Sequence, residues 1–167
     1  MALTTKESGV SFRTIGPVVL AIFFFAGVKC MAQETKEVPL PQLPPGAGKM
    51  DADAPKTMTK TNSGLQYRIL RKGTDTKPKA TNKVEVNYHG WLDDGTVFDS
   101  SYRRRESISF GLNQVIPGWT EGMQLVGEGG MIELTIPPNL GYGSRGAGAA
   151  VPPNATLHFL VELIKVQ

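Results

Sequence analysis

Apolar residues recur along the second half of the chain with the spacing of half-buried β-strands, in which every second side chain faces the core. The alternation is regular where Val84, Val86 and Tyr88 are separated by polar neighbours. Other β-favouring runs are bounded by Gly and Pro. We therefore predict strands at 65–70, 84–89, 131–136 and 156–166, with a shorter one at 108–112.

The segment Asp93-Asp94-Gly95 is a turn signal between two short apolar pairs, at 91–92 and 97–98. A helical pattern occurs once: Trp119, Met123 and Val126 are spaced by four and three residues, after Pro117 and before a glycine-rich stop at 127–130. We predict a helix over 117–126. Several strands and one short helix predict an α+β domain with an antiparallel sheet.

The N-terminus resembles an export signal. Basic residues precede an uncharged run, Val18–Val28, which is shorter than the ~20 apolar residues of a membrane-spanning helix. We therefore expect residues 1–32 to be a signal peptide cleaved after Ala32. Lipidation at Cys30 and an uncleaved anchor are the alternatives. The protein is then exported to the periplasm or cell envelope, and its domain is not embedded in a membrane.

Residues 33–58 are rich in proline and poor in large apolar side chains. Such a segment buries too little surface to offset its ordering entropy, so we predict a flexible linker. A docking segment for a proline-recognising partner is the alternative. The folded domain is then expected over 59–167.

Composition excludes several function classes. The chain has 167 residues, 18 basic and 15 acidic side chains and a net charge of +3, which does not favour nucleic acid as a partner. Two His and one Cys cannot form the usual zinc or disulfide frameworks. No metal or other cofactor is expected. The basic run Arg103-Arg104-Arg105 is interpreted as a solvated turn.

Motifs in the folded part resemble those of the FKBP-type peptidyl-prolyl cis-trans isomerases, the immunophilins that bind tacrolimus and rapamycin. The similarity extends to exported bacterial members such as the macrophage infectivity potentiator. It is carried in order by VEVNYHG at 84–90, DGTVFDSS at 94–101, VIPGWTEG at 115–122, IPPNLGYG at 136–143 and VPPNATLHF at 151–159.

This resemblance implies a twisted five- or six-stranded antiparallel sheet wrapped around one short helix, with an apolar pocket between them. It implies catalytic roles for Tyr88, Phe98, Asp99, Trp119, Tyr142 and Phe159. It implies substrate-binding roles for Val115, Ile116, Val151, Ile108, Arg104 and Ala150.

The implied function is to accelerate rotation about X-Pro bonds in exported polypeptides, and the resemblance also implies binding of macrolides such as tacrolimus and rapamycin. An FKBP-like chaperone or docking module with little turnover is the alternative. Ile108, Ala147 and Ala150 depart from the best-known members, and these smaller or non-aromatic side chains are expected to open the mouth of the pocket.

Overall fold

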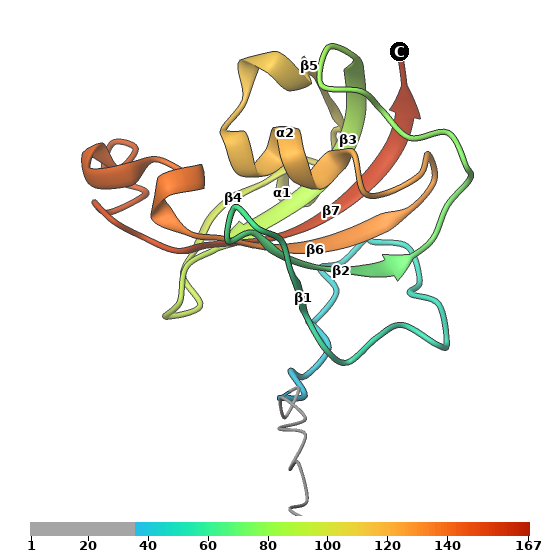
Figure 1. The fold of residues 1–167 in the computed structure, drawn as a ribbon, viewed down its shortest axis with the longest axis horizontal. Helices are drawn as coiled ribbons and strands as arrows, with labels where there is room; N and C mark the ends of the chain where they lie inside the picture. Colours follow the sequence, from blue (N-terminus) through green and yellow to red (C-terminus); the bar gives the residue numbers. More distant parts are fainter. Residues whose placement is uncertain (1–35) are drawn as a thin grey trace, which may run out of the picture. The chain divides into compact units, whose positions relative to one another are not determined.

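The computed structural model describes residues 36–167. Its centre is a single antiparallel sheet in the order β1-β2-β6-β7-β3-β4, with β5 also paired to β3 (Figure 1). The strands are β1 (Thr59–Lys60), β2 (Gln66–Arg71), β3 (Lys83–Trp91), β4 (Val97–Ser100), β5 (Ile108–Gly111), β6 (Met131–Ile136) and β7 (Leu157–Val166).

The predicted α+β fold and all the predicted strand segments are confirmed. The sheet has seven strands instead of five or six, because the two-residue β1 pairs with β2. Strands β4 and β5 pair with different parts of the long strand β3. Short helical turns α1 (Ser101–Arg104), η1 (Leu112–Gln114), η2 (Pro138–Leu140) and η3 (Gly143–Arg145) occur in the connections.

Helix α2 (Pro117–Met123) lies across one face of the sheet (Figure 1). Pro117 occupies the first turn, where its fixed φ is compatible with a helix and its missing N–H is not needed. The helix ends at Met123, three residues before the predicted end. There the amides of Gln124 and Leu125 bond to carbonyls three residues back, which tightens the final turn.

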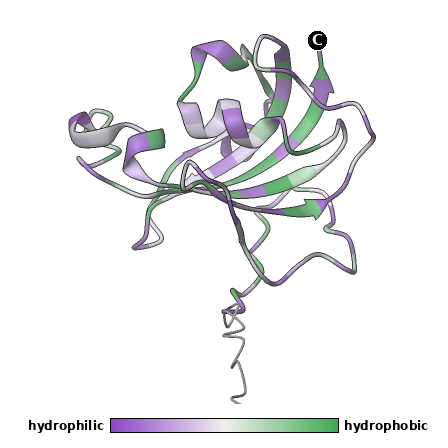
Figure 2. Cartoon of the chain, viewed as in Figure 1, coloured by the Kyte–Doolittle hydropathy of each residue, from purple (hydrophilic) through white to green (hydrophobic). Residues whose placement is uncertain are grey.

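The main core lies between α2 and the sheet. It includes Trp119, Met123 and Leu134, while hydrophobic residues run along β6 and β7 (Figure 2). A smaller cluster of Leu70, Met131 and Leu160 occupies the opposite face of the sheet. Successive strand residues point to opposite faces, and here both faces carry apolar side chains. Both faces of the sheet therefore need a cover.

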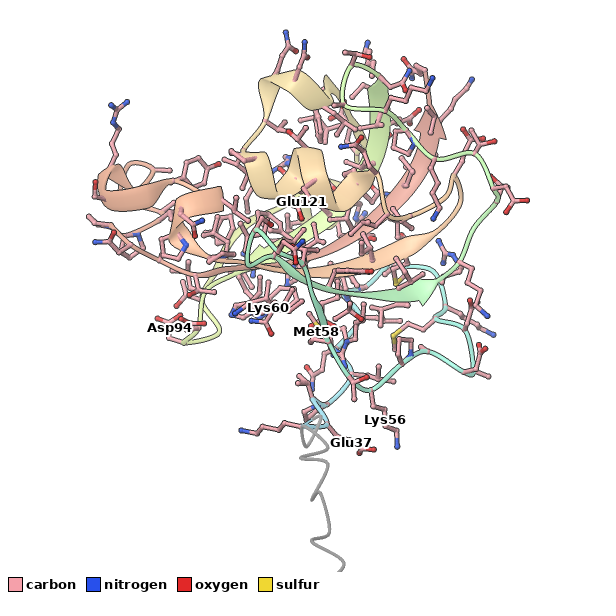
Figure 3. The ribbon with its side chains drawn as sticks, in the orientation of Figure 1. Glu37, Lys56, Met58, Lys60, Asp94 and Glu121 are labelled. Atoms are coloured by element: carbon pink, nitrogen blue, oxygen red, sulfur yellow. The ribbon has the colours of Figure 1, made fainter. Side chains whose placement is uncertain are left out.

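Residues 36–58, which we call the strap, provide that second cover. Leu43, Met50 and Ala54 pack against the smaller cluster. The Val38 N–H donates to the Lys56 carbonyl at 2.8 Å, so the ends of the strap meet, and Figure 3 shows Glu37 beside Lys56. The strap therefore lies on the sheet face opposite α2.

For the described residues 36–58, this packing contradicts the flexible linker that the sequence predicts over 33–58. Few apolar side chains are needed, because the side chain of Arg68 binds the strap's backbone. Its Nη1 and Nη2 donate to the carbonyls of Val38 and Pro39 at 2.7 and 2.6 Å. Strand β2 is consequently covered on both faces and is not half-buried as predicted. The predicted signal peptide, 1–32, lies outside the described residues.

Arg68 also forms a buried ion pair across β2 and β6. Its Nε donates to Glu133 Oε2 at 2.6 Å, and the Arg68 side chain is fully buried. Burial raises the pKa of Glu133, and the hydrogen bond and charge of Arg68 oppose that rise. The guanidinium therefore supports both a buried carboxylate and the backbone of the strap.

The predicted turn at 93–95 connects β3 and β4, with Asp94 at the tip of the hairpin (Figure 3). Helix α1, which the sequence pattern did not predict, follows β4 directly. It ends at Arg104, and the capping residue Arg105 that follows is in the left-handed region, with φ of 56°. No helix within residues 36–167 is long and apolar enough to cross a membrane.

Replacing Arg68 with Met leaves Glu133 as an unpaired buried charge and frees the carbonyls of the strap. We expect this variant to lose about 3–5 kcal/mol of unfolding free energy, measured by urea denaturation. The control is Lys72→Met, because Lys72 and Asp53 form an exposed ion pair, and we expect almost no change. Equal stability of the two variants would contradict the buried role of Arg68.

Candidate functional site

A pocket of about 260 Å³ opens between α2, the sheet and the loops beside them. Strands β3, β4, β5 and β7 contribute side chains, as does the segment leading into α2. The pocket is lined by Tyr88, Phe98, Asp99, Ile108, Phe110, Gln114, Val115, Ile116, Trp119, Tyr142 and Phe159.

The floor of the pocket is aromatic. Trp119, in the first turn of α2, is only 5% exposed. Its ring centroid lies 5.5 Å from Tyr88, 5.2 Å from Phe159 and 5.3 Å from Phe110. Phe98 contacts Phe159 at 5.4 Å with perpendicular planes. Edge-to-face packing of this kind fixes each ring and stabilises the cluster beyond simple burial.

Gly90 in β3 makes room for two of these rings. A Cβ at this position would lie 2.7 Å from Phe98 Cζ and 2.8 Å from Phe159 Cε1. Such distances are shorter than ordinary van der Waals contact, so a side chain would displace the rings. The pocket wall thus requires the glycine that ends the VEVNYHG motif.

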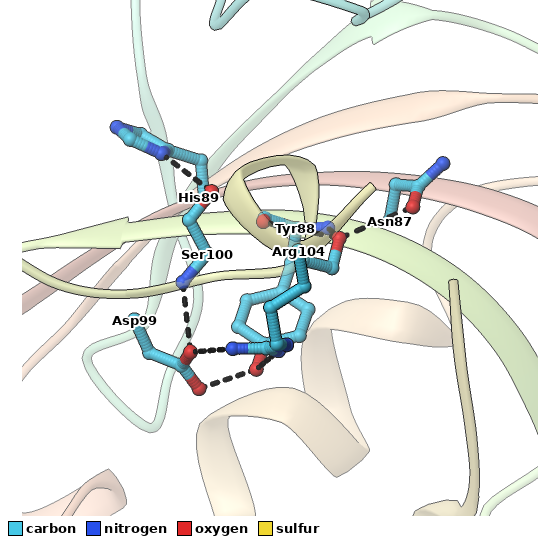
Figure 4. A network of polar contacts seen from close by, with 7 residues as sticks. Asn87, Tyr88, His89, Asp99, Ser100 and Arg104 are labelled. Carbon is cyan, nitrogen blue, oxygen red and sulfur yellow. Dashed lines mark hydrogen bonds and ion pairs between the residues drawn. The ribbon is translucent and has the colours of Figure 1, made fainter. Parts of the chain in front are cut away.

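One edge of the pocket is polar (Figure 4). The Tyr88 hydroxyl donates to Asp99 Oδ2. Arg104 donates through Nη1 to Asp99 Oδ1 and through Nη2 to the Tyr88 hydroxyl, the latter at 2.8 Å. Its guanidinium also lies 5.7 Å from the centre of the Tyr88 ring. The three groups form a closed hydrogen-bonded ring at the pocket wall.

These contacts determine the charge of Asp99. Burial acts to raise its pKa, but the hydrogen bonds from Tyr88 and Arg104 and the positive charge of Arg104 outweigh burial and lower the pKa. Burial, together with the hydrogen bond to Asp99, raises the pKa of Tyr88. At neutral pH the pocket edge therefore contains an ionised carboxylate and a neutral phenol.

Buried polar groups support this edge from behind (Figure 4). Ser101, which is fully buried, accepts a hydrogen bond from the Tyr88 N–H at 2.8 Å and donates to Asn87 Oδ1 at 3.1 Å. The Ser100 N–H donates to Asp99 Oδ1 at 2.8 Å. Both strand β3 and the β4–α1 junction are thereby fixed beside the pocket.

Most of the predicted site residues line this pocket. Arg104 does not, but it binds Asp99 and Tyr88 as described. Val151 is buried in the core, where its backbone pairs with Ala147, and Ala150 is exposed in the adjoining turn. Neither lines the pocket, so their predicted contacts with a substrate have no support in this geometry.

Phe110 and Gln114 line the pocket and were not predicted. Phe110 follows Ile108 by two residues in β5, so the alternation of a strand places both on the same face. That signal was available in the sequence. Gln114 ends the η1 turn, whose geometry no periodic pattern reveals.

A family model described as FKBP-type peptidyl-prolyl cis-trans isomerase matches residues 74–164. The chain belongs to this family. Every residue that lines the pocket of this FKBP domain lies within the matched range, whereas the strap lies before it.

Relatives agree with this assignment. A probable FKBP-type isomerase of Haemophilus influenzae is 51% identical over 111 residues, covering 66% of this chain and 46% of that protein. Outer membrane protein MIP of Legionella longbeachae is 47% identical over 105 residues, covering 63% and 45%. The crystal structure of FkpA from Escherichia coli has a TM-score of 0.64 at 47% identity, covering 66% and 51%. The chain spans about half the length of these relatives.

Replacing Arg104 with Gln removes the positive charge beside Asp99. We expect the pKa of Asp99, followed by carbon NMR of its carboxyl group, to lie below the ordinary value in the original protein and to rise in the variant. A lowered pKa in the folded state means that Asp99 stabilises the fold above its unfolded pKa. That contribution disappears as the pH falls through the folded pKa.

Asp94 is the matched control. Its pKa is lowered mainly by a hydrogen bond from the Thr96 backbone, so it should titrate alike in both proteins. An unchanged Asp99 titration in the Arg104→Gln variant would show that Arg104 does not determine the charge at the pocket edge.

Proposed function

We propose that this protein is a peptidyl-prolyl cis-trans isomerase that accelerates the folding of exported, proline-containing polypeptides. The observation that carries the proposal is the pocket of an FKBP-family chain, with a buried aromatic floor and a single polar edge. The alternative is an FKBP-like chaperone or docking module with little turnover.

The chemistry requires no nucleophile or proton transfer. The barrier of about 18–20 kcal/mol to rotation comes from amide resonance, which is lost when the C–N bond twists. Resonance separates charge, so water favours the planar ground state. An apolar pocket removes that hydration and favours the less polar twisted amide, which is differential binding of the transition state.

Each part of the pocket has a corresponding role. Trp119, Phe159 and Phe98 surround the prolyl ring and exclude water. The Ile116 N–H and the Tyr142 hydroxyl donate hydrogen bonds to carbonyls of the substrate. Tyr142 is 40% exposed, which suits a group that must reach a bound peptide at the rim. Ionised Asp99 supplies a fixed charge beside the rotating amide.

We also propose a periplasmic or cell-envelope location, with residues 1–32 removed as a signal peptide. The N-terminal sequence supports this, as do similarities to FkpA and to a relative named outer membrane protein MIP. Residues 59–167 then comprise the isomerase domain, and the strap covers the sheet face opposite α2.

The direct test is refolding of a protein whose slow phase is limited by proline isomerisation, which takes tens to hundreds of seconds when uncatalysed. We expect the original protein to accelerate that phase. Phe98 is half-buried in the free protein, and a bound prolyl ring would complete its burial. Phe98→Ala should lower kcat/KM roughly 10- to 100-fold, because full burial of a Phe contributes about 1.5–3 kcal/mol and 1.4 kcal/mol corresponds to tenfold.

Leu40→Ala is the control, because Leu40 is an exposed residue of the strap, and it should retain full activity. Thermal unfolding checks that both variants are folded. No acceleration by micromolar original protein would contradict the isomerase proposal. Suppression of client aggregation by a Phe98→Ala, Asp99→Ala variant would then favour the chaperone.

A macrolide provides an independent test of the pocket. Trp91 stacks on His158 on the other face of the sheet, so a Trp91→Phe background leaves Trp119 as the only indole. We expect saturating tacrolimus to change the fluorescence of Trp119, because the ligand would displace water from the pocket floor. An unchanged spectrum, with binding confirmed by calorimetry, would place the ligand elsewhere.

A further inference from the structure

A second cleft, of about 950 Å³, lies outside the aromatic pocket. We call it the edge cleft, because the edge strand β4 contributes to it. Its size is near the upper end of the ~300–1,000 Å³ typical of ligand pockets. It is lined by Gln42, Leu43, Pro44, Pro45, Gly46, Asn87, His89, Val97, Ser100, Tyr102, Arg103, Arg105, Glu106, Ser107 and Ile164.

The two sites share strands but use different residues. In β3, Tyr88 lines the aromatic pocket while its neighbour His89 lines the edge cleft. In β4, Asp99 lines the pocket while Ser100 lines the cleft. Ser100 Oγ and His89 Nδ1 are 3.1 Å apart (Figure 4). Because adjacent strand residues point to opposite faces, the cleft lies behind the polar edge of the pocket.

The basic run 103–105 is divided between these sites. Arg104 binds Asp99, whereas Arg103 and Arg105 line the cleft and are exposed. The Arg105 N–H donates to the Tyr102 carbonyl at 3.1 Å, and the Glu106 N–H to the Ser101 carbonyl at 3.3 Å. These bonds fix the turn, so the two arginines are presented by an ordered backbone.

Positively charged side chains outnumber negatively charged ones in the lining of the edge cleft. Burial lowers the pKa of His89, and the positive charge of Arg103 lowers it further, so His89 is neutral at neutral pH. Two guanidinium groups then face the cleft, opposed by the carboxylate of Glu106. Carboxylates are the partners that guanidinium groups bind best in proteins, together with phosphates.

Both walls of the cleft are attached to one buried carboxylate. Glu162 is buried; its Oε1 accepts from the Gly48 N–H of the strap at 3.0 Å, and its Oε2 from the Tyr102 hydroxyl of α1 at 2.6 Å. Arg71 pairs with Glu162 Oε1 at 2.9 Å. The cleft is therefore formed in advance, which lowers the ordering cost of binding.

We propose that the edge cleft binds an acidic, extended segment of a polypeptide. Charge complementarity favours carboxylates, and the hydroxyl and amide groups of Ser100, Ser107 and Asn87 can bond to peptide groups. Pro44 and Pro45 form a wall without backbone donors, which suits apolar contact with an extended chain. A recessed cleft admits a chain more readily than a flat membrane surface. This binding does not depend on isomerase activity.

The test uses a fluorescein-labelled peptide of alternating Glu and Ser, without proline, and a matched peptide of alternating Gln and Ser. We expect fluorescence anisotropy to show that the protein prefers the acidic peptide, and that salt weakens the binding. Arg103→Gln with Arg105→Asn should raise the Kd roughly 5- to 10-fold, as expected for two exposed charge pairs. Asn is chosen because it tolerates the left-handed backbone.

Glu106→Gln should lower the Kd about twofold, since it removes the opposing charge. The control, Lys77→Gln with Arg145→Gln, removes two exposed positive charges outside the cleft and should bind like the original protein. The NMR signals of the His89 ring should shift when the peptide is added. None of these measurements requires turnover.

Three results would overturn the proposal: equal affinity for both peptides, equal weakening by the cleft and control variants, or an unperturbed His89 signal at saturation. Binding to vesicles rich in anionic lipid but not to the acidic peptide would also overturn it, and would assign the arginines to membrane attraction.

Discussion

The close approach of α2 to the sheet determines the depth and shape of the pocket. A Cβ on Gly118 would lie 2.5 Å from Ile136 Cγ2, and one on Gly122 would lie 2.7 Å from Leu134 Cδ2. These two glycines let the helix backbone rest directly on β6. Trp119 follows Gly118, so its indole is held against the rings of Tyr88 and Phe159, which project from the sheet. A more distant helix would leave the aromatic floor without lateral support.

The hydrogen-bonded ring at the pocket edge depends on how three neighbouring elements meet. Asp99, Tyr88 and Arg104 come from β4, β3 and α1, and their hydrogen bonds form only where these elements meet. The network keeps a carboxylate ionised beside an apolar surface, where an isolated charge would be costly. It also holds the phenol of Tyr88 in one orientation, so its ring remains part of the aromatic wall.

The sequence predicted most of this arrangement because the strands carry regular alternation and the site residues fall in distinctive motifs. Its failures have specific physical causes. The strap was mistaken for a flexible linker because its stabilisation comes from Arg68 and Glu162, distant residues acting on backbone atoms that leave no hydrophobic pattern. The predicted helix runs too far, to Val126, because that side chain is buried although it lies beyond the end of α2. The position of Gln114 in the pocket depends on the geometry of the η1 turn, which the sequence pattern does not reveal.

The closed strap also fixes the geometry of attachment. Its two ends meet at the Val38–Lys56 hydrogen bond, and the described chain begins there, on the sheet face opposite α2 (Figures 1 and 3). Residue 36 and the rest of the strap thus lie on the sheet face that does not form the aromatic pocket. A polypeptide that enters the aromatic pocket would reach the domain from the face opposite the one where the described chain begins.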